Sequence, residues 1–305
     1  MIIYKNFPLH KMSYIRVGGK VLKLYIPEKE NELQELFSKE DSGKKTVVFG
    51  LASNFLLPDV PSDDFVYVSM KKMREFMEIS ENEVHISAGY NLMELIYKSA
   101  AKGTGENLFP LSGIPGTMGG CAYVNAGGSN KSDSDHIGNW ITEIRLFDIK
   151  KKKTLTLKKN DLKFSYRHSI LKEMKDSGME FIILDLKLLL TPTEIKGSKL
   201  KVMKYIDTKL KTQPVGKYSL GCIFKNPIEQ NKPAWEYISE LGDENMSLGT
   251  MELSDLHKNF IINNSKLGLA SDFMKLAESI KTRVSKRFNI NLEREVEYFS
   301  DYSAS

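Results

Sequence analysis

Ser112–Gly120 is the stretch that decides the fold, and its sequence is SGIPGTMGG. Glycine has no β-carbon, so a loop this rich in glycine lets the backbone approach a ligand closely and direct several N–H groups at a diphosphate. Proline fixes one φ angle and stiffens the loop before a ligand arrives. The stretch therefore predicts a cofactor-binding loop, whose candidate residues are Gly113, Ile114, Pro115, Gly116, Thr117, Gly119 and Gly120.

Two common nucleotide-binding motifs do not match this loop. No Gly-Lys-Ser/Thr follows it, as a phosphate-binding P-loop requires, and no strand leads directly into it, as the dinucleotide fingerprint requires. A tight turn between two layers of a domain remains the alternative interpretation.

The sequence around the loop alternates strands and helices. Apolar and β-branched runs predict strands over 21–26, 46–49, 65–69, 83–87, 141–148, 153–157, 181–190 and 292–299, and helical spacing predicts helices over 31–39, 91–102 and 271–288. This pattern predicts an α+β fold with some mixed sheet. The lysine-rich residues 196–211 are expected to connect a first domain, residues 1–195 with two subdomains, to a second domain, residues 196–305.

Composition narrows the classes of function. The chain has 305 residues, 41% of them hydrophobic, which is enough for about two folded domains. A net charge of +5 is mild, and no helix-turn-helix spacing or zinc-finger ligand set accompanies it, so we expect no nucleic-acid partner. The five histidines do not fall at metal-ligand spacing, so we expect no metal.

The sequence also indicates a compartment. Cys121 and Cys222 form no CxxC pair, and the first residues lack a basic-then-apolar signal sequence, which together favour a reducing cytoplasm. The longest apolar stretch, residues 181–190, is interrupted by Asp185 and Lys187, so we expect no membrane partner. We expect the chain to act as a monomer.

Besides the motif around Cys222, three further motifs carry candidate chemistry, and each has a simpler structural alternative. Gly50, Ser53 and Asn54 follow a strand and offer room and polar groups for a cofactor, but an ordinary strand-ending turn fits equally. Arg167 could bind a carboxylate or an oxyanion through two parallel hydrogen bonds, or form a surface salt bridge. Glu295 shares one face of a predicted strand with Glu293, which a charged edge strand would also explain.

Cys222 lies in Gly221–Pro227, where a reactive side chain next to glycine is followed by apolar anchors and then by Lys225 and Asn226. A cysteine thiol has a reference pKa of about 8.5, so it gives up a proton far more readily than a serine hydroxyl. A buried structural cysteine is the alternative interpretation.

The order of these motifs along the chain resembles the UDP-N-acetylenolpyruvoylglucosamine reductase family, the MurB family. The similar segments cover nearly the whole chain: Ser13–Gly19, Phe49–Leu56, Gly113–Gly120 with Asn125-Ala126-Gly127, Tyr166-Arg167, Gly221–Pro227, Ser254–Asn263 and Leu292–Val296. The combination is specific, whereas each piece alone is not.

The resemblance implies an FAD-binding domain of the vanillyl-alcohol oxidase type with a smaller α+β substrate-binding domain. It implies FAD and NADPH as cofactors and a nucleotide-sugar substrate. The implied reaction has two halves, in which NADPH reduces the FAD and the enolpyruvyl double bond of the UDP-sugar then accepts a hydride and a proton, giving UDP-N-acetylmuramate for peptidoglycan synthesis.

The resemblance also implies roles for individual residues. Arg167 and Glu295 would flank the enolpyruvyl carboxylate, with Glu295 protonated or hydrogen-bonded because a bare carboxylate would repel the same charge. Lys225 and Asn226 would bind the substrate, and Asn125 would contribute to cofactor binding. The family commonly has a serine as proton donor where this chain has Cys222.

That substitution has two interpretations: a thiol that serves as the general acid, which the intact surrounding motif favours, or altered activity. A second departure is Leu51-Ala52, where the family usually has glycines. The alternatives that stay open are a different FAD oxidoreductase on the same fold, such as an oxidase, and a flavin-binding or nucleotide-sugar-binding protein without turnover.

Overall fold

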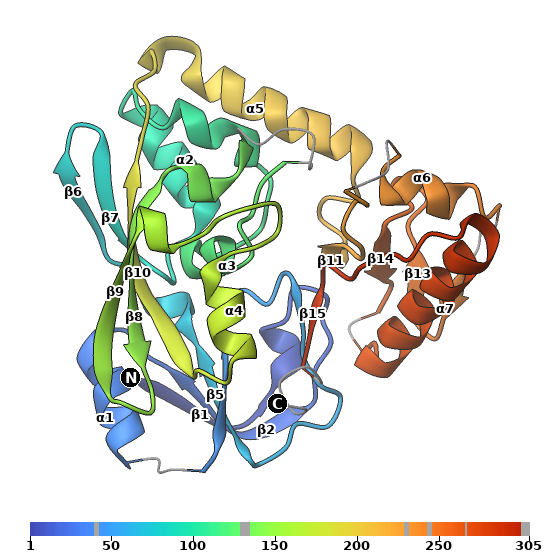
Figure 1. Ribbon diagram of the computed structural model, residues 1–305, viewed down its shortest axis with the longest axis horizontal. Coiled ribbons are helices and arrows are strands. Elements are labelled where there is room, and N and C mark those ends of the chain that lie inside the picture. The colour runs from blue at the N-terminus through green and yellow to red at the C-terminus, as the bar shows by residue number, and fades with distance from the viewer. Residues whose placement is uncertain (40–42, 129–134, 229–231, 243–245, 266, 300–305) are drawn as a thin grey trace. The chain divides into compact units, whose positions relative to one another are not determined.

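The computed structural model describes residues 1–39, 43–128, 135–228, 232–242, 246–265 and 267–299 (Figure 1). The chain forms two compact units. Unit 1 comprises residues 1–5, 23–51 and 63–208, and unit 2 comprises residues 6–22, 52–62 and 209–305. Both units combine helices with sheets, which confirms the expected α+β class.

A four-stranded sheet lies mostly in unit 1. Its order is β1 (Ile2–Pro8), β2 (Lys20–Ile26), β5 (Phe65–Ser69) and β3 (Lys45–Phe49). Strand β5 pairs in parallel with both β2 and β3. Helix α1 (Glu30–Lys39) buries Leu33, Leu36 and Phe37 in a hydrophobic core. Strands of this sheet contribute side chains to the same core.

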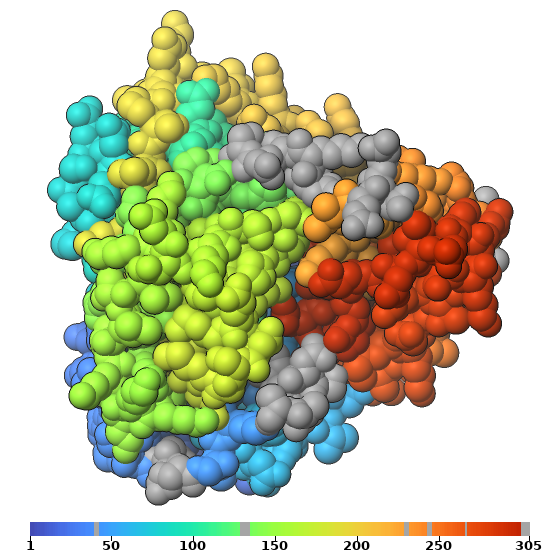
Figure 2. Space-filling model, viewed as in Figure 1, coloured from blue at the N-terminus to red at the C-terminus, as the bar shows by residue number. Residues whose placement is uncertain are grey.

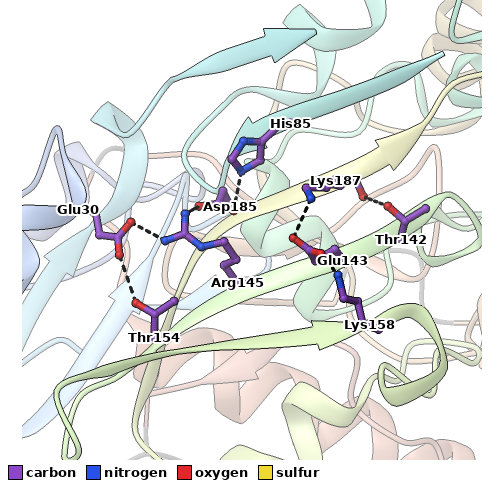
Figure 3. A network of polar contacts seen from close by, with 9 residues as sticks. All are labelled: Glu30, His85, Thr142, Glu143, Arg145, Thr154, Lys158, Asp185 and Lys187. Carbon is purple, nitrogen blue, oxygen red and sulfur yellow. Dashed lines mark hydrogen bonds and ion pairs between the residues drawn. The ribbon is translucent and has the colours of Figure 1, made fainter. Parts of the chain in front are cut away.

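A five-stranded antiparallel sheet forms the rest of unit 1's framework. Its order is β6 (Phe76–Ser80), β7 (Glu83–Ser87), β10 (Phe181–Leu189), β8 (Ile141–Asp148) and β9 (Lys153–Lys158). Alternate residues of the central strands, such as Ile144 and Leu186, are buried in the main core, and the neighbouring positions carry a network of charged side chains (Figure 3).

Helices complete unit 1: α2 (Leu92–Ala101), α3 (Met118–Tyr123), α4 (Ile170–Asp176) and α5 (Ile195–Thr212), along which the chain passes into unit 2. Asn91 is the N-cap of α2, and its side chain accepts a hydrogen bond from the Glu94 N–H at 3.2 Å. Strand β9 and helix α4 lie on the viewed face of unit 1, in yellow-green (Figure 2).

Unit 2 has a four-stranded sheet in the order β11 (Tyr218–Cys222), β14 (Phe260–Asn263), β13 (Met251–Leu253) and β12 (Ser247–Leu248). Helices α6 (Ala234–Ser239) and α7 (Ala270–Phe288) pack in its core. A parallel pair joins β4 (Phe55–Leu56) to β15 (Glu297–Tyr298). Ile15, Val17 and Leu56 are buried in this same core, so unit 2 contains two short N-terminal segments that a single boundary between residues 195 and 196 would leave out.

Several local expectations differ from the structure. The lysine-rich connection is largely the helix α5, with a kink at Lys196 and Gly197. The expected strand over 292–299 is regular only at Glu297–Tyr298. The glycine-rich stretch is not all loop, because α3 begins inside it at Met118.

Candidate active site

The glycine-rich stretch in unit 1 is fixed by backbone hydrogen bonds to the turn that follows β7. The Met118 and Gly119 N–H groups donate to the carbonyls of Tyr90 and Ala88 at 2.9 and 2.8 Å, and the Leu92 N–H donates to Gly116 at 3.1 Å. A β-carbon at Gly119 would lie 2.7 Å from that of Ala88, so glycine is needed for this close approach. The loop is therefore held in place by the protein itself.

The loop has hydrogen-bonding capacity that the protein does not use. Within the described part of the chain, the N–H groups of Gly116, Thr117 and Gly120 have no acceptor. Thr117 is buried, and buried N–H groups in folded proteins are almost always paired. Of the atoms that the structure describes, a β-carbon at Gly120 would meet only the Thr117 hydroxyl, at 3.5 Å. These N–H groups suit the phosphate oxygens of a dinucleotide such as FAD.

Gly50 contacts this loop directly. It follows β3, and a β-carbon at this position would lie 2.1 Å from the Thr117 hydroxyl oxygen, so no other residue fits without displacing Thr117. Gly50 and Thr117, both expected in the cofactor site, are thus brought together in unit 1. Ile114 and Pro115 are half-buried in the same loop, and Gly113 donates its N–H to the Met93 sulfur at 2.9 Å.

Asn125 follows α3, with a left-handed φ of 47°. Its side chain is buried, and both of its ends bond to protein backbone: the amide donates to the Ser165 carbonyl at 2.7 Å, and the carbonyl accepts from the Gly138 N–H at 2.9 Å. The side chain expected to contact a cofactor therefore already has protein partners on both of its polar atoms.

Arg167 lies in a tight turn in which Ser165 and His168 bond each other's backbone twice, at 3.1 and 3.2 Å. Its φ is 53°, a left-handed value that is uncommon for a residue with a long side chain. The guanidinium donates to the Gly127 carbonyl at 3.2 Å and lies 5.2 Å from the centre of the Tyr166 ring.

In unit 2, Cys222 ends β11 next to Gly221, whose φ is 81°. Among the described residues, nothing lies within 4 Å of a β-carbon built on Gly221, so this glycine is required by the backbone turn rather than by crowding. The pairing register with β14 shifts between Ser219 and Cys222. Cys222 is half-buried and in no disulfide.

The backbone after Cys222 pairs with the segment that carries Glu295. The Glu295 N–H donates to the Ile223 carbonyl at 2.8 Å, and the Lys225 N–H donates to the Glu293 carbonyl, also at 2.8 Å. The fold therefore places the candidate acid Cys222 and the candidate residue Glu295 on neighbouring extended segments.

Three more expected site residues lie on this framework. The Asn54 amide donates to the Glu295 carbonyl at 3.1 Å, while Ser53 next to it is half-buried. The Lys225 ammonium forms an ion pair with Glu293. The Asn226 side-chain carbonyl accepts from the Ala234 N–H at 3.1 Å and so fixes the start of α6.

Asn259 is a site-forming residue to which the sequence alone assigned no role. It is buried, and its side chain accepts from the Phe224 N–H at 3.0 Å and donates to the Phe224 carbonyl at 2.7 Å. Its own carbonyl accepts from the Ile223 N–H at 2.8 Å. The available signals were its place in Ser254–Asn263, a segment that resembles the family, and its position directly before the apolar strand β14.

Other features of the described residues lie apart from these sites. A pocket of about 290 Å³ contains none of the expected site residues; it is lined by Glu106, Phe109, Lys201, Lys204, Tyr205 and Thr208. In the described part of the chain, no three His, Cys, Asp or Glu side chains are grouped so that they could hold a metal ion. No helix in that part is both long and apolar enough to cross a membrane.

Models of two known domain families match the parts of the chain that contain these candidate residues. Residues 22–157 match the model of an FAD binding domain, and residues 213–299 match the model of the UDP-N-acetylenolpyruvoylglucosamine reductase C-terminal domain. The loop Gly113–Gly120 and Gly50 lie in the first match, and Cys222 and Glu295 lie in the second.

Proteins named UDP-N-acetylenolpyruvoylglucosamine reductase resemble this chain over nearly its whole length. The Orientia tsutsugamushi protein is 32% identical over 96% of this chain and 92% of its own, and the Fusobacterium nucleatum protein is 30% identical over 97% and 99%.

A solved structure gives the same result. The crystal structure of the Thermus caldophilus reductase has a TM-score of 0.78 and 25% identity, covering 98% of this chain and 99% of that one. With the unpaired N–H groups of the glycine-rich loop and the adjacent Cys222 and Glu295 segments, these similarities show that the chain belongs to the UDP-N-acetylenolpyruvoylglucosamine reductase family and is an FAD-dependent oxidoreductase.

Proposed function

We propose that this protein reduces UDP-N-acetylglucosamine enolpyruvate to UDP-N-acetylmuramate with NADPH, a step of peptidoglycan precursor synthesis, and that Cys222 supplies the proton. The observation that carries the proposal is the backbone pairing that places Cys222 beside the Glu295 segment, in a chain whose family is FAD-dependent. FAD, when bound, supplies the hydride chemistry between the reductant and the substrate.

The protein's own residues would hold this cofactor and leave the chemistry to it. The N–H groups of Gly116, Thr117 and Gly120 would bind the diphosphate, with Gly50 packed against Thr117 to keep the loop in place. Ser53 and Asn54 are the remaining polar candidates for cofactor binding. In this proposal residues 1–195 bind FAD and residues 196–305 bind the substrate.

Arg167 would stabilise the charge that develops during reduction. Addition of a hydride to the enolpyruvyl double bond moves electron density toward the adjacent carboxylate, so a fixed guanidinium gains interaction energy in the transition state. Glu295 would hydrogen-bond to the same carboxylate. Lys225 and Asn226 would bind the nucleotide sugar, as the family resemblance implies.

Cys222 would complete the reaction. Its thiol proton would go to the substrate carbon that did not receive the hydride, leaving a thiolate that solvent reprotonates; the double bond thereby gains one hydride and one proton. A thiol suits this role because its proton is more acidic than that of a serine hydroxyl. We also propose that the protein acts as a monomer in the cytoplasm, which size-exclusion chromatography with light scattering and fractionation of cells would test.

The test separates the two half-reactions. Purified protein is mixed anaerobically with NADPH, and the loss of flavin absorbance is followed; UDP-N-acetylglucosamine enolpyruvate is then added, and the return of absorbance is followed. We expect Cys222→Ala to leave the first rate unchanged and to slow the second by about 10²–10⁴-fold, the usual contribution of a general acid.

Cys222→Ser is the matched control, because serine is the residue that the family commonly has at this position. It should retain a measurable second half-reaction. A second half-reaction that is equally fast in wild type and Cys222→Ala would refute the assignment of the proton donor. A protein that binds no FAD or does not respond to the enolpyruvyl substrate would refute the function as a whole.

A further inference from the structure

Residues 123–127 and 165–169 of unit 1 are joined by three bonds from side chains to backbone carbonyls. These are Ser169 Oγ to Tyr123 at 2.7 Å, Asn125 Nδ2 to Ser165 at 2.7 Å, and Arg167 Nη2 to Gly127 at 3.2 Å. The first segment continues the glycine-rich loop through α3, and the second contains the Arg167 turn. The three bonds therefore connect the cofactor loop with the candidate catalytic arginine.

Asn125 is the central member of this set. It is only 3% exposed, and besides its bond to Ser165 it accepts a hydrogen bond from the Gly138 N–H at 2.9 Å. Its left-handed φ of 47° is one that asparagine tolerates better than most residues. A side chain satisfied at both ends by backbone groups is suited to hold two segments together rather than to bind a ligand.

The Arg167 turn depends on such an anchor. Arg167 lies outside any strand or helix, since α4 begins only at Ile170, and the turn's own backbone bonds link Ser165 only to His168. Ser165 itself is exposed, although Phe164 before it packs against the main core. Of the three bonds between the two segments, the one from the Asn125 amide holds the first residue of the turn.

We propose that Asn125 is a positioning residue for Arg167 and not a side-chain ligand of FAD. It holds the Ser165 carbonyl, and through the rigid turn it sets where the Arg167 guanidinium lies relative to the glycine-rich loop. The inference deepens the proposed function, because it rests on the role of Arg167 in the substrate half-reaction.

A small displacement of Arg167 would matter, because a shift of about 1 Å in a catalytic group can cost about 10²-fold in rate. The loss should fall on the half-reaction in which Arg167 acts. Reduction of the flavin by NADPH does not involve the substrate carboxylate, so it should not change.

The experiment compares two variants. Asn125→Gly removes the side chain while tolerating the left-handed backbone, and Asn125→Asp keeps the shape and the acceptor for Gly138 but turns the donor toward Ser165 into a carboxylate oxygen that repels it. Both should keep bound FAD, its spectrum and the NADPH rate, and both should slow reoxidation by the enolpyruvyl substrate by roughly 10- to 100-fold.

A double-mutant cycle with Arg167→Ala gives the readout that a general structural defect would not produce. If Asn125 acts through Arg167, then Asn125→Gly should slow reoxidation much less in the Arg167→Ala background than in wild type. Asn107→Ala is the matched control: that side chain also bridges backbone, from the Leu189 carbonyl at 3.1 Å to the Thr191 N–H at 3.0 Å, but it has no link to the Arg167 turn. It should leave both half-reactions unchanged.

The outcomes separate this inference from the function on which it rests. Loss of FAD in both Asn125 variants, full additivity with Arg167→Ala, or an unchanged reoxidation rate in Asn125→Gly would overturn the positioning role. If Arg167→Ala itself does not slow reoxidation, the role proposed for Arg167 fails first, and the inference fails with it.

Discussion

At the scale of single residues, Gly50 and Gly120 are needed for different reasons, although both were expected in one cofactor site. The absent β-carbon of Gly50 leaves room for the Thr117 hydroxyl of the protein itself. The absent β-carbon of Gly120 leaves space that no atom of the described residues fills closer than 3.5 Å. Gly50 thus serves the fold, whereas the role proposed for Gly120 is to leave room for the ligand.

These roles predict opposite effects of alanine. Gly50→Ala should destabilise even the FAD-free protein by about 1–3 kcal/mol, the usual cost of overpacking. Gly120→Ala should leave the FAD-free protein as stable or stabilise it by up to about 1 kcal/mol, because position 120 lies in the helix α3, yet it should weaken FAD binding. Urea unfolding of the apoprotein and fluorescence titration with FAD measure the two quantities. Equal loss of stability in both variants would contradict the distinction.

The sequence identifies such residues more easily than it identifies their partners. A glycine directly after a strand and a dense glycine loop are local patterns, so Gly50 and Gly113–Gly120 could be recognised without a structure. The contact between Gly50 and Thr117 depends on tertiary packing, and so does the bond from Asn125 to Ser165. A sequence does not distinguish a buried asparagine whose side chain bonds two backbone groups, such as Asn125 or Asn259, from an asparagine on the surface.

At the scale of elements, the strands with clear β-branched or alternating patterns were predicted to within a few residues, among them β3, β5, β7 and β8. The segment Leu292–Val296 was expected as a strand but makes only scattered pairings, through Glu293 and Glu295. Its backbone pairs with the segment after Cys222 at these two positions and does not form a regular sheet edge. Helix α5 was missed because its many lysines suggested a connection.

The polar network of the five-stranded sheet is a property of these elements together (Figure 3). Arg145 on β8 forms ion pairs with Asp185 on β10 at 3.0 Å and with Glu30 of α1 at 2.6 Å. It therefore links the five-stranded sheet to helix α1, whose apolar side chains pack in a separate hydrophobic cluster. Further along β8, Glu143 lies between Lys158 of β9 and Lys187 of β10 and is 8% exposed.

This network predicts a pH dependence of stability. The hydrogen bond from Lys158, with help from Lys187, lowers the pKa of Glu143 below its ordinary value of 4.5, although burial opposes the shift. The folded protein therefore holds this proton less tightly than the unfolded chain does. The ionised carboxylate stabilises the fold above about pH 4.5, and that stabilisation is lost as the pH falls through the lowered pKa of the folded state.

Glu143→Gln should reduce the free energy of unfolding at pH 7 and make its decline below pH 4.5 shallower than in wild type. Chemical unfolding at a series of pH values between 3 and 7 checks both expectations. Glu83→Gln on β7 is the control, since Glu83 forms no ion pair among the described residues. Parallel curves for wild type and Glu143→Gln would show that the ion pairs contribute no acid-sensitive stability.

At the scale of the whole molecule, the chain enters unit 2 three times. The match to the family's C-terminal domain covers residues 213–299, but the core of unit 2 also buries Ile15, Val17 and Leu56. Asp59 accepts hydrogen bonds from the Ala270 and Ser271 N–H groups at 2.6 and 3.0 Å and so caps α7, whose own N-cap residue, Leu269, cannot. No local pattern could predict contributions from such distant segments.

Residues 209–305 alone should therefore not fold into a stable domain. Losing three buried apolar side chains removes roughly 5–9 kcal/mol of burial energy at about 1.5–3 kcal/mol each, which is comparable with the whole stability of a domain, about 5–15 kcal/mol. Loss of the Asp59 cap adds about 1–2 kcal/mol. The fragment should show little near-ultraviolet circular dichroism and no cooperative thermal transition.

A single-chain variant that joins residues 6–22 and 52–62 to 209–305 through flexible linkers should recover both signals, because it restores the core and the cap. Cooperative unfolding of the fragment by itself would mean that the N-terminal segments are held by unit 2 without being needed for its fold.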